Sequence, residues 1–313
     1  RVAGHVSQHR PVRGPLVQTV YRHDRKHLVD RPGVRQGLEH REVAEIRLAE
    51  DVLERLQFLG QVVEAAAKRL FGEDEVHVTT LLSDAATGAV TNPPEKHRIL
   101  SELEAIAQRS NARDILFIHL AGHGNVNADG EFVFLTAEAS SLQDGDYTGV
   151  TMREINDALM GVKASQRILI LDACHSGEAV QDLMGDGSMD MAYTARNNVS
   201  VEEDIARGRQ LDRLGDNANM TMLTASASDQ AAFELPEIGH GLLTFALLDA
   251  IQGHTDILTE GRFLEVKPWV YQAEKTVNAR STGPNRQQAQ ALNPANYPIG
   301  EITADVRELI QIE

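Results

Sequence analysis

The stretch RILILDACHSG, residues 167–177, holds both a strong strand signal and the only cysteine of the chain. Its first half is apolar and rich in β-branched side chains, which is typical of a strand buried on both faces of a sheet. The strand is expected to end at Asp172 and to carry Cys174 into a loop. A second stretch, DILFIHLAGHG at 114–124, has the same form and places His123 after a buried strand.

His123 and Cys174 are the candidate catalytic pair. Loops that follow the carboxyl ends of strands in open α/β sheets converge on one crevice, so we expect the two residues to lie close together. A thiol is mostly protonated at neutral pH, and a neighbouring imidazole can take its proton and later donate one to a leaving amine. Cys174 is the predicted nucleophile, and the backbone amides of Gly124 and Cys174 are the predicted oxyanion donors.

Helix and strand patterns alternate on both sides of these two strands, which predicts an α/β domain. The segment TMRE at 151–154 has the spacing of a helix capping box. Further strands are expected at 76–82, 131–136 and 220–227, and helices at 53–72, 95–109, 151–161, 242–251 and 268–279.

Bulk composition narrows the class of function. The chain has 313 residues, of which 42% are hydrophobic, so it can bury a sizeable core. A net charge of −16 disfavours nucleic acid, and we expect protein or peptide partners instead. A single cysteine excludes an intramolecular disulfide and a Cys-rich zinc site. No apolar run approaches the roughly 20 residues that cross a bilayer, and no segment resembles a signal peptide, so a cytoplasmic location without membrane contact is expected.

Residues 1–48 show little hydrophobic period and contain five His with scattered Pro and Gly. We expect an N-terminal extension that contributes no strand to the sheet, whether it is disordered, a cloning remnant or an unrelated extension. The main domain is then 49–313. Within it, residues 179–219 are rich in Gly, Asp, Arg and Asn, which is typical of a long loop.

The motifs LAGHG at 120–124 and LDACHSG at 171–177 resemble the two active-site motifs of caspase-like cysteine peptidases of the C14 type, and most closely those of bacterial metacaspases and orthocaspases. In caspases the histidine lies about 50 residues before the cysteine, and the separation here is 51. The resemblance covers roughly residues 50–300, including TASASDQAAFE at 224–234 and GHGLLTFALLDAI at 239–251.

This resemblance implies a three-layer α/β/α sandwich with a mostly parallel central sheet. It also implies a cysteine endopeptidase that works through a Cys-His dyad and an acyl-enzyme without a required cofactor. The chain would divide into a large-subunit-like part at 49–178, a linker at 179–219 and a small-subunit-like part at 220–313. Self-cleavage is expected in the linker, where the candidate positions are Arg196, Arg207, Arg209 and Arg213.

The residue two positions before the nucleophile helps to line the S1 pocket in this family, and here it is Asp172. A carboxylate there implies Arg or Lys before the scissile bond, at P1, and would repel the Asp that true caspases require. Ala121 and Ser228 occupy neighbouring pocket positions in the resemblance. The alternative for Asp172 is a strand-end cap or ion-pair partner.

Other histidines and acidic clusters have simpler interpretations. We expect His119 to be a core residue and His175 to be structural, and His240 competes with His123 for the role of base. The acidic stretches 144–146 and 186–190 lack EF-hand spacing and are expected to be solvated loops, so no metal site is predicted, although calcium activates some metacaspases. Two further functions stay open: a catalytically silent scaffold with the caspase fold, and a cysteine hydrolase that acts on other bonds.

Overall fold

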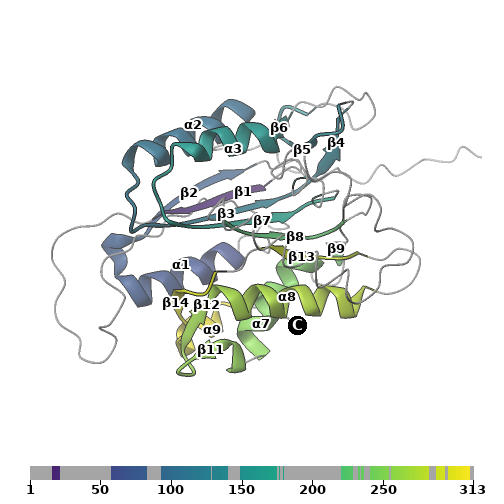
Figure 1. Ribbon diagram of the computed structural model, residues 1–313. Coiled ribbons are helices and arrows are strands. Elements are labelled where there is room, and N and C mark those ends of the chain that lie inside the picture. Colours follow the sequence, from purple (N-terminus) through teal and green to yellow (C-terminus); the bar gives the residue numbers. More distant parts are fainter. Residues whose placement is uncertain are drawn as a thin grey trace, which may run out of the picture.

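A computed structural model of the protein describes residues 16–21 (backbone only), 58–82, 93–127, 129–139, 149–174, 176, 179, 220–227, 232, 234–235, 240–253, 255–281, 287–292 and 295–310. These residues form three layers, with a six-stranded sheet between two groups of helices (Figure 1). The expected α/β/α sandwich is confirmed.

The central sheet has the strand order β13-β8-β7-β3-β1-β2. Strands β3, β7 and β8 pair in parallel, β1 is antiparallel to both β2 and β3, and β13 is antiparallel to β8. Four strands therefore run in one direction, as the prediction of a mostly parallel sheet requires. The bounds are β1 Leu16–Tyr21, β2 His77–Leu82, β3 Ile115–Ala121, β7 Gln166–Asp172, β8 Met220–Thr224 and β13 Gln290–Leu292.

Helices cover both faces of this sheet, which explains why its central strands are continuously apolar. Helices α2 (Lys96–Arg109) and α3 (Met152–Met160) lie on one face, and α1 (Phe58–Phe71), α7 (Leu242–Gly253) and α8 (Val266–Arg280) lie on the other (Figure 1). Alternate residues of β3 enter two separate cores. Leu116 and Ile118 belong to the core under α2 and α3, and Phe117 belongs to the other, where it stacks on Trp269 at 6.3 Å between ring centroids.

Shorter elements complete the described part of the chain. Strands β4 (Gly124–Val126), β5 (Phe132–Leu135) and β6 (Gly149–Thr151) form a small antiparallel sheet directly after β3. The others are β9 (Glu234–Leu235) with β10 (His240–Gly241), β11 (Leu258–Thr259) with β12 (Phe263–Glu265) and β14 (Pro298–Glu301), the 3-10 turns η1 (Glu73–Glu75) and η4 (Thr255–Ile257), and α9 (Ala304–Glu308).

The expectation that residues 1–48 contribute no strand is wrong at β1, which lies inside the sheet between β2 and β3. The predicted capping box is confirmed, because Glu154 N donates to Thr151 Oγ1 at 3.2 Å and Thr151 N donates to Glu154 Oε2 at 3.0 Å. The expected linker lies outside the described residues except for Ala179. Within the described ranges, the helices are too short or too polar to span a bilayer.

Candidate active site

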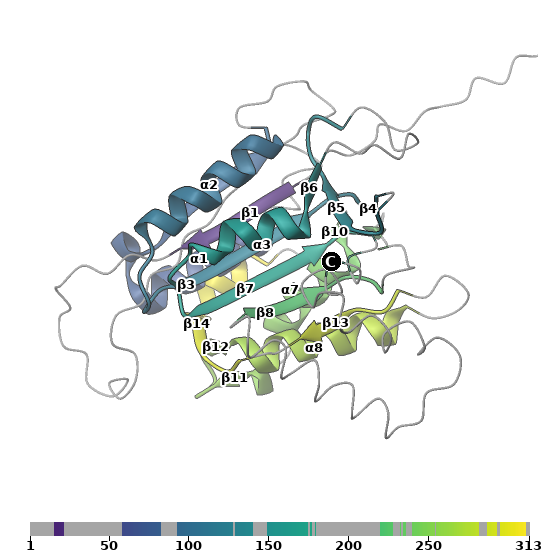
Figure 2. The same ribbon diagram turned by 45° about the horizontal axis from the view of Figure 1, so that its top comes forward.

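The two motif loops leave adjacent parallel strands at the same edge of the sheet. Ala121, the last residue of β3, is in register with Asp172, the last residue of β7. Figure 2 shows the carboxyl end of β7 pointing toward the end of the molecule where β4, β5 and β10 gather. Strand order and register thus place the loop of His123 beside the loop of Cys174.

Glycines bring the backbones of these loops into contact. Gly122 N donates to the carbonyl of Asp172 at 3.1 Å, and Gly122 has a φ of 154°, in the region that favours glycine. A Cβ at Gly124 would lie 2.4 Å from the Cys174 carbonyl oxygen and 2.6 Å from the Phe132 ring. Only glycine fits at position 124 without a shift of one loop, so the close approach is built into the sequence.

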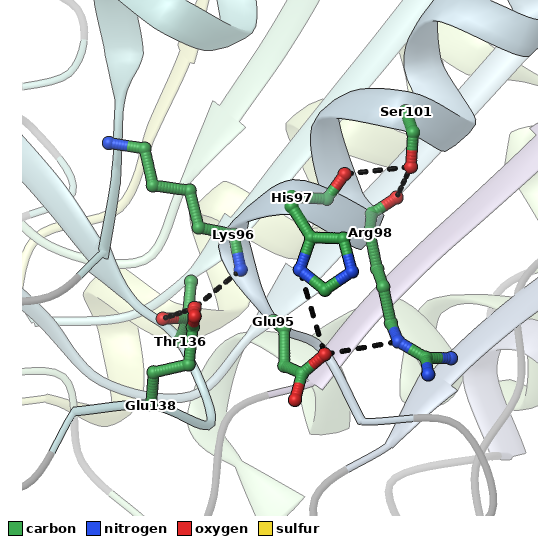
Figure 3. A network of polar contacts seen from close by, with 7 residues as sticks. All are labelled: Glu95, Lys96, His97, Arg98, Ser101, Thr136 and Glu138. Carbon is green, nitrogen blue, oxygen red and sulfur yellow. Dashed lines mark hydrogen bonds and ion pairs between the residues drawn. The ribbon is translucent and has the colours of Figure 1, made fainter.

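His123 is half-buried, and its backbone is held from the side of β5. Leu135 N donates to the His123 carbonyl at 2.9 Å. Beyond Leu135 the chain is fastened to the start of α2, because Glu138 Oε2 accepts hydrogen bonds from Lys96 N at 2.8 Å and from Thr136 Oγ1 at 3.2 Å (Figure 3). A carboxylate at a helix N-terminus is favourable, since the first backbone N–H groups have no partner within the helix.

The first turn of α2 carries its own polar contacts in the same view (Figure 3). Glu95 Oε2 lies 3.1 Å from Arg98 Nε and 3.6 Å from His97 Nδ1, and Ser101 Oγ donates to the His97 carbonyl at 2.7 Å. These exposed groups lie at the surface. The hydrogen bond from Lys96 N to Glu138 Oε2 is also at the surface, and it connects the start of α2 to the segment that follows β5.

Cys174 is half-buried, and its sulfur lies against the backbone of Ala232. Ala232 N donates to Sγ at 3.4 Å, and Sγ lies 3.8 Å from the Ala232 carbonyl oxygen. Ala232 comes from the stretch that follows β8, so the small-subunit-like part of the chain reaches the candidate nucleophile.

Two buried serines form hydrogen bonds that hold the loop of Cys174. Ser226 Oγ donates to the Ala173 carbonyl at 3.3 Å, and Ser226 N donates to Ser176 Oγ at 3.1 Å. Both serines are fully buried. Sequence reasoning did not single out Ser176, Ser226 or Ala232, although all three lie inside the quoted motif stretches; their partners are about 50 positions away, which periodicity does not reveal.

Asp172 is only 6% exposed and lies under the start of α7. Its Oδ2 accepts hydrogen bonds from Thr244 N at 3.1 Å and from Thr244 Oγ1 at 2.6 Å. A Cβ at Gly241 would fall 2.4 Å from the same carboxylate oxygen. Asp172 therefore accepts hydrogen bonds from the first turn of α7. Its neighbour Ala121 is 3% exposed.

Of the remaining residues that the sequence analysis named, some lie in the described part of the chain and others lie outside it. His119 is completely buried in β3, which confirms its core position, and burial lowers the pKa of its imidazole to about 3. The backbone of His240 pairs with Leu235 immediately before α7. Several residues lie outside the described part of the chain: His175, Ser228, Arg196, Arg207, Arg209, Arg213 and the acidic stretches 144–146 and 186–190. Among described side chains, no three His, Cys, Asp or Glu residues gather as a metal site would require.

Comparisons with known proteins bear on the family. The model of the peptidase C14 caspase domain matches residues 40–292. Among solved structures, the crystal structure of protein GSU0716 from Geobacter sulfurreducens is similar, with 14% identity and a TM-score of 0.42 over 87% of this chain and 92% of that one. A search of curated proteins finds no match. Because the family model covers most of the sequence, the chain belongs to the caspase-domain family of C14 peptidases.

Proposed function

We propose that the protein is a cysteine endopeptidase in which Cys174 is the nucleophile and His123 is the acid and base. The observation that supports this most directly is the close approach of Gly124 to the Cys174 carbonyl oxygen, which sets the histidine loop beside the cysteine loop. Membership of the C14 family supports the same reaction class.

In the proposed reaction, His123 takes the proton of the Cys174 thiol as sulfur attacks the scissile carbonyl carbon and the carbonyl electron pair moves onto oxygen. The amides of Gly124 and Cys174 donate to this oxyanion, and losing one such donor typically costs about 3 kcal/mol. The C–N bond then breaks, and His123 gives its proton to the leaving amine. Water, deprotonated by His123, hydrolyses the thioester and restores the thiol.

We propose Arg or Lys as the preferred P1 residue, with Asp172 as its acidic partner and Ala121 and Ser228 at neighbouring pocket positions. The net charge of −16 supports attraction of basic peptides over the whole surface. The linker 179–219 contains Arg196, Arg207, Arg209 and Arg213, and we propose that the enzyme cleaves itself there.

A silent scaffold remains the second candidate, and one observation favours it: both backbone polar groups of Ala232 contact the sulfur of Cys174. Alkylation by iodoacetamide at pH 6 discriminates the two. A catalytic thiol reacts rapidly there and slows when His123 is replaced, whereas a buried inert thiol shows neither behaviour.

The decisive experiment compares wild type with Cys174→Ala on fluorogenic peptides that carry Arg, Lys, Asp or Leu at P1, with and without calcium. We expect cleavage after Arg and Lys by the wild type alone, and fragments of the wild-type chain whose ends lie in 179–219, while Cys174→Ala stays intact. Cleavage after Asp or Leu keeps the dyad and removes the proposed pocket. Hydrolysis of other amides without peptide cleavage indicates a different cysteine hydrolase, and no hydrolysis indicates the scaffold.

A further inference from the structure

The first turn of α7 contacts the carboxylate of Asp172 through Thr244. Thr244 donates to Asp172 Oδ2 from its backbone N–H at 3.1 Å and from its hydroxyl at 2.6 Å. Thr244 is 0% exposed, and the two residues are 72 positions apart in the sequence. The contact therefore ties the end of β7 to a helix of the small-subunit-like part.

Thr244 is the one polar residue among the buried positions of α7; the others are Leu242, Leu243, Phe245, Ala246, Leu247, Leu248, Ala250 and Ile251. Burying a hydroxyl is unfavourable unless it is hydrogen-bonded, so an apolar residue would suit this core position better in the absence of a partner. Asp172 is that partner. The hydrogen bond to the carboxylate, rather than the packing of the helix, explains why a threonine occupies position 244.

The same geometry limits how the Asp172 carboxylate can move. Hydrogen bonds to a charged acceptor are short and strongly directional, so two donors on one oxygen hold the group in one orientation. Thr244 lies in the first turn of α7, where backbone N–H groups have no partner within the helix. Gly241 packs closely against the carboxylate, because a Cβ at this position would lie 2.4 to 2.8 Å from the carboxyl atoms. The carboxylate is thus held in one place.

We propose that Thr244 is a positioning residue for substrate specificity: its hydroxyl orients the Asp172 carboxylate toward a basic P1 side chain. This inference rests on the proposed function, since it concerns the pocket of the same site. Thr244 acts through Asp172 and does not itself contact the reacting atoms.

The test uses Thr244→Val, which removes the hydroxyl and keeps the shape and the backbone N–H. Thr244→Ser is the conservative variant that keeps the hydroxyl. Thr221→Val is the matched control, because Thr221 is a buried threonine of β8 whose Oγ1 accepts a hydrogen bond from Ala295 N at 3.2 Å, outside the site. Each variant is assayed as the full chain on two peptides that differ only in Arg or Leu at P1.

We expect Thr244→Val to lower the ratio of kcat/KM for the Arg peptide to that for the Leu peptide by about 10-fold or more, mainly through KM, since hydrogen bonds to charged groups are worth roughly that factor. Thr244→Ser should restore the ratio, and Thr221→Val should leave it at the wild-type value. Equal losses on both peptides in Thr244→Val, or no loss, would overturn the inference, because a purely structural role weakens both substrates alike.

A second measurement keeps this inference separate from the proposed function. Cys174 is alkylated with two irreversible peptidyl acyloxymethyl ketones that end in Arg or Leu, and the rates are compared for wild type, Thr244→Val and Asp172→Asn. A preference for the Arg probe that both variants lose supports the role of Thr244 even where peptide hydrolysis fails. A preference that survives in Asp172→Asn, or is missing in wild type, refutes it.

Discussion

At the scale of single residues, His119 is a pH-sensitive point in the core. Burial lowers the pKa of its imidazole to about 3, from an ordinary value of 6.5. The unfolded chain therefore binds a proton below pH 6.5 that the folded chain does not bind until about pH 3. Stability is complete above pH 6.5 and falls as the pH decreases, by about 1.4 kcal/mol per pH unit from this residue.

The measurement is the free energy of unfolding by denaturant between pH 7 and pH 5, where most carboxylates are still ionised. His119→Gln should flatten the slope by about one proton. A wild-type slope in His119→Gln would show that the acid sensitivity arises elsewhere.

Gly124 is the residue on which the approach of the two motif loops depends. In Gly124→Ala the new Cβ meets the Cys174 carbonyl oxygen and the Phe132 ring, so one loop must move. We expect kcat/KM on a cleaved peptide to fall by about 100-fold or more, because displacements near 1 Å can cost that factor. Gly253→Ala is the matched control, since a Cβ there has no atom within 4 Å. Equal activity of the two variants would contradict the proposed arrangement.

At the scale of elements, α8 covers the outer edge of the central sheet. Backbone N–H groups in the edge strand β13 and just before it donate to side chains of α8. Ala291 N donates to Glu274 Oε1 at 3.0 Å, and Ala289 N donates to Asn278 Oδ1 at 2.9 Å. Open strand edges promote pairing between chains, so these contacts protect the sheet.

Replacing Glu274 by Ala should leave the Ala291 N–H without its acceptor and lower the free energy of unfolding by about 1–3 kcal/mol. It should also raise the tendency to self-associate, which sedimentation at increasing protein concentration would detect. Lys267→Ala, on the exposed side of the same helix, is the control. A variant as stable and as monodisperse as wild type would mean that this contact does not guard the edge.

The elements also show how far sequence reasoning reaches. Strands β3 and β7 were predictable because a run of apolar residues marks a strand buried on both faces, and His123 and Cys174 follow directly from their ends. The hydrogen bonds of Asp172 were not predictable, since nothing local indicates that Thr244, 72 positions later, lies in the first turn of the helix that contacts it. Strands of two or three residues carry too little periodic signal for prediction.

At the scale of the whole molecule, β1 was missed for a related reason. Its sequence LVQTVY contains good strand formers, but the flanking residues are polar and its partners lie far along the chain. All six residues of β1 pair with β2 on one side and with β3 on the other. A segment that was expected to contribute no strand is therefore an interior strand that joins β2 to the rest of the sheet.

The last prediction concerns residues 49–313, the segment that the sequence analysis identified as the main domain. Without β1, the backbone groups of β2 and β3 lose their partners along six residue pairs on each side, and β2 loses its connection to the sheet. Domains are stable by only about 5–15 kcal/mol, so the loss of an interior strand should abolish cooperative folding.

Thermal unfolding followed by circular dichroism should show a cooperative transition for a chain that starts at residue 12 and none for 49–313. Adding a peptide of residues 12–25 should restore part of that transition, because β1 is antiparallel to both neighbours and can enter between them as a separate strand. A cooperative transition of 49–313 at the full-length Tm would instead show that the sheet closes without β1.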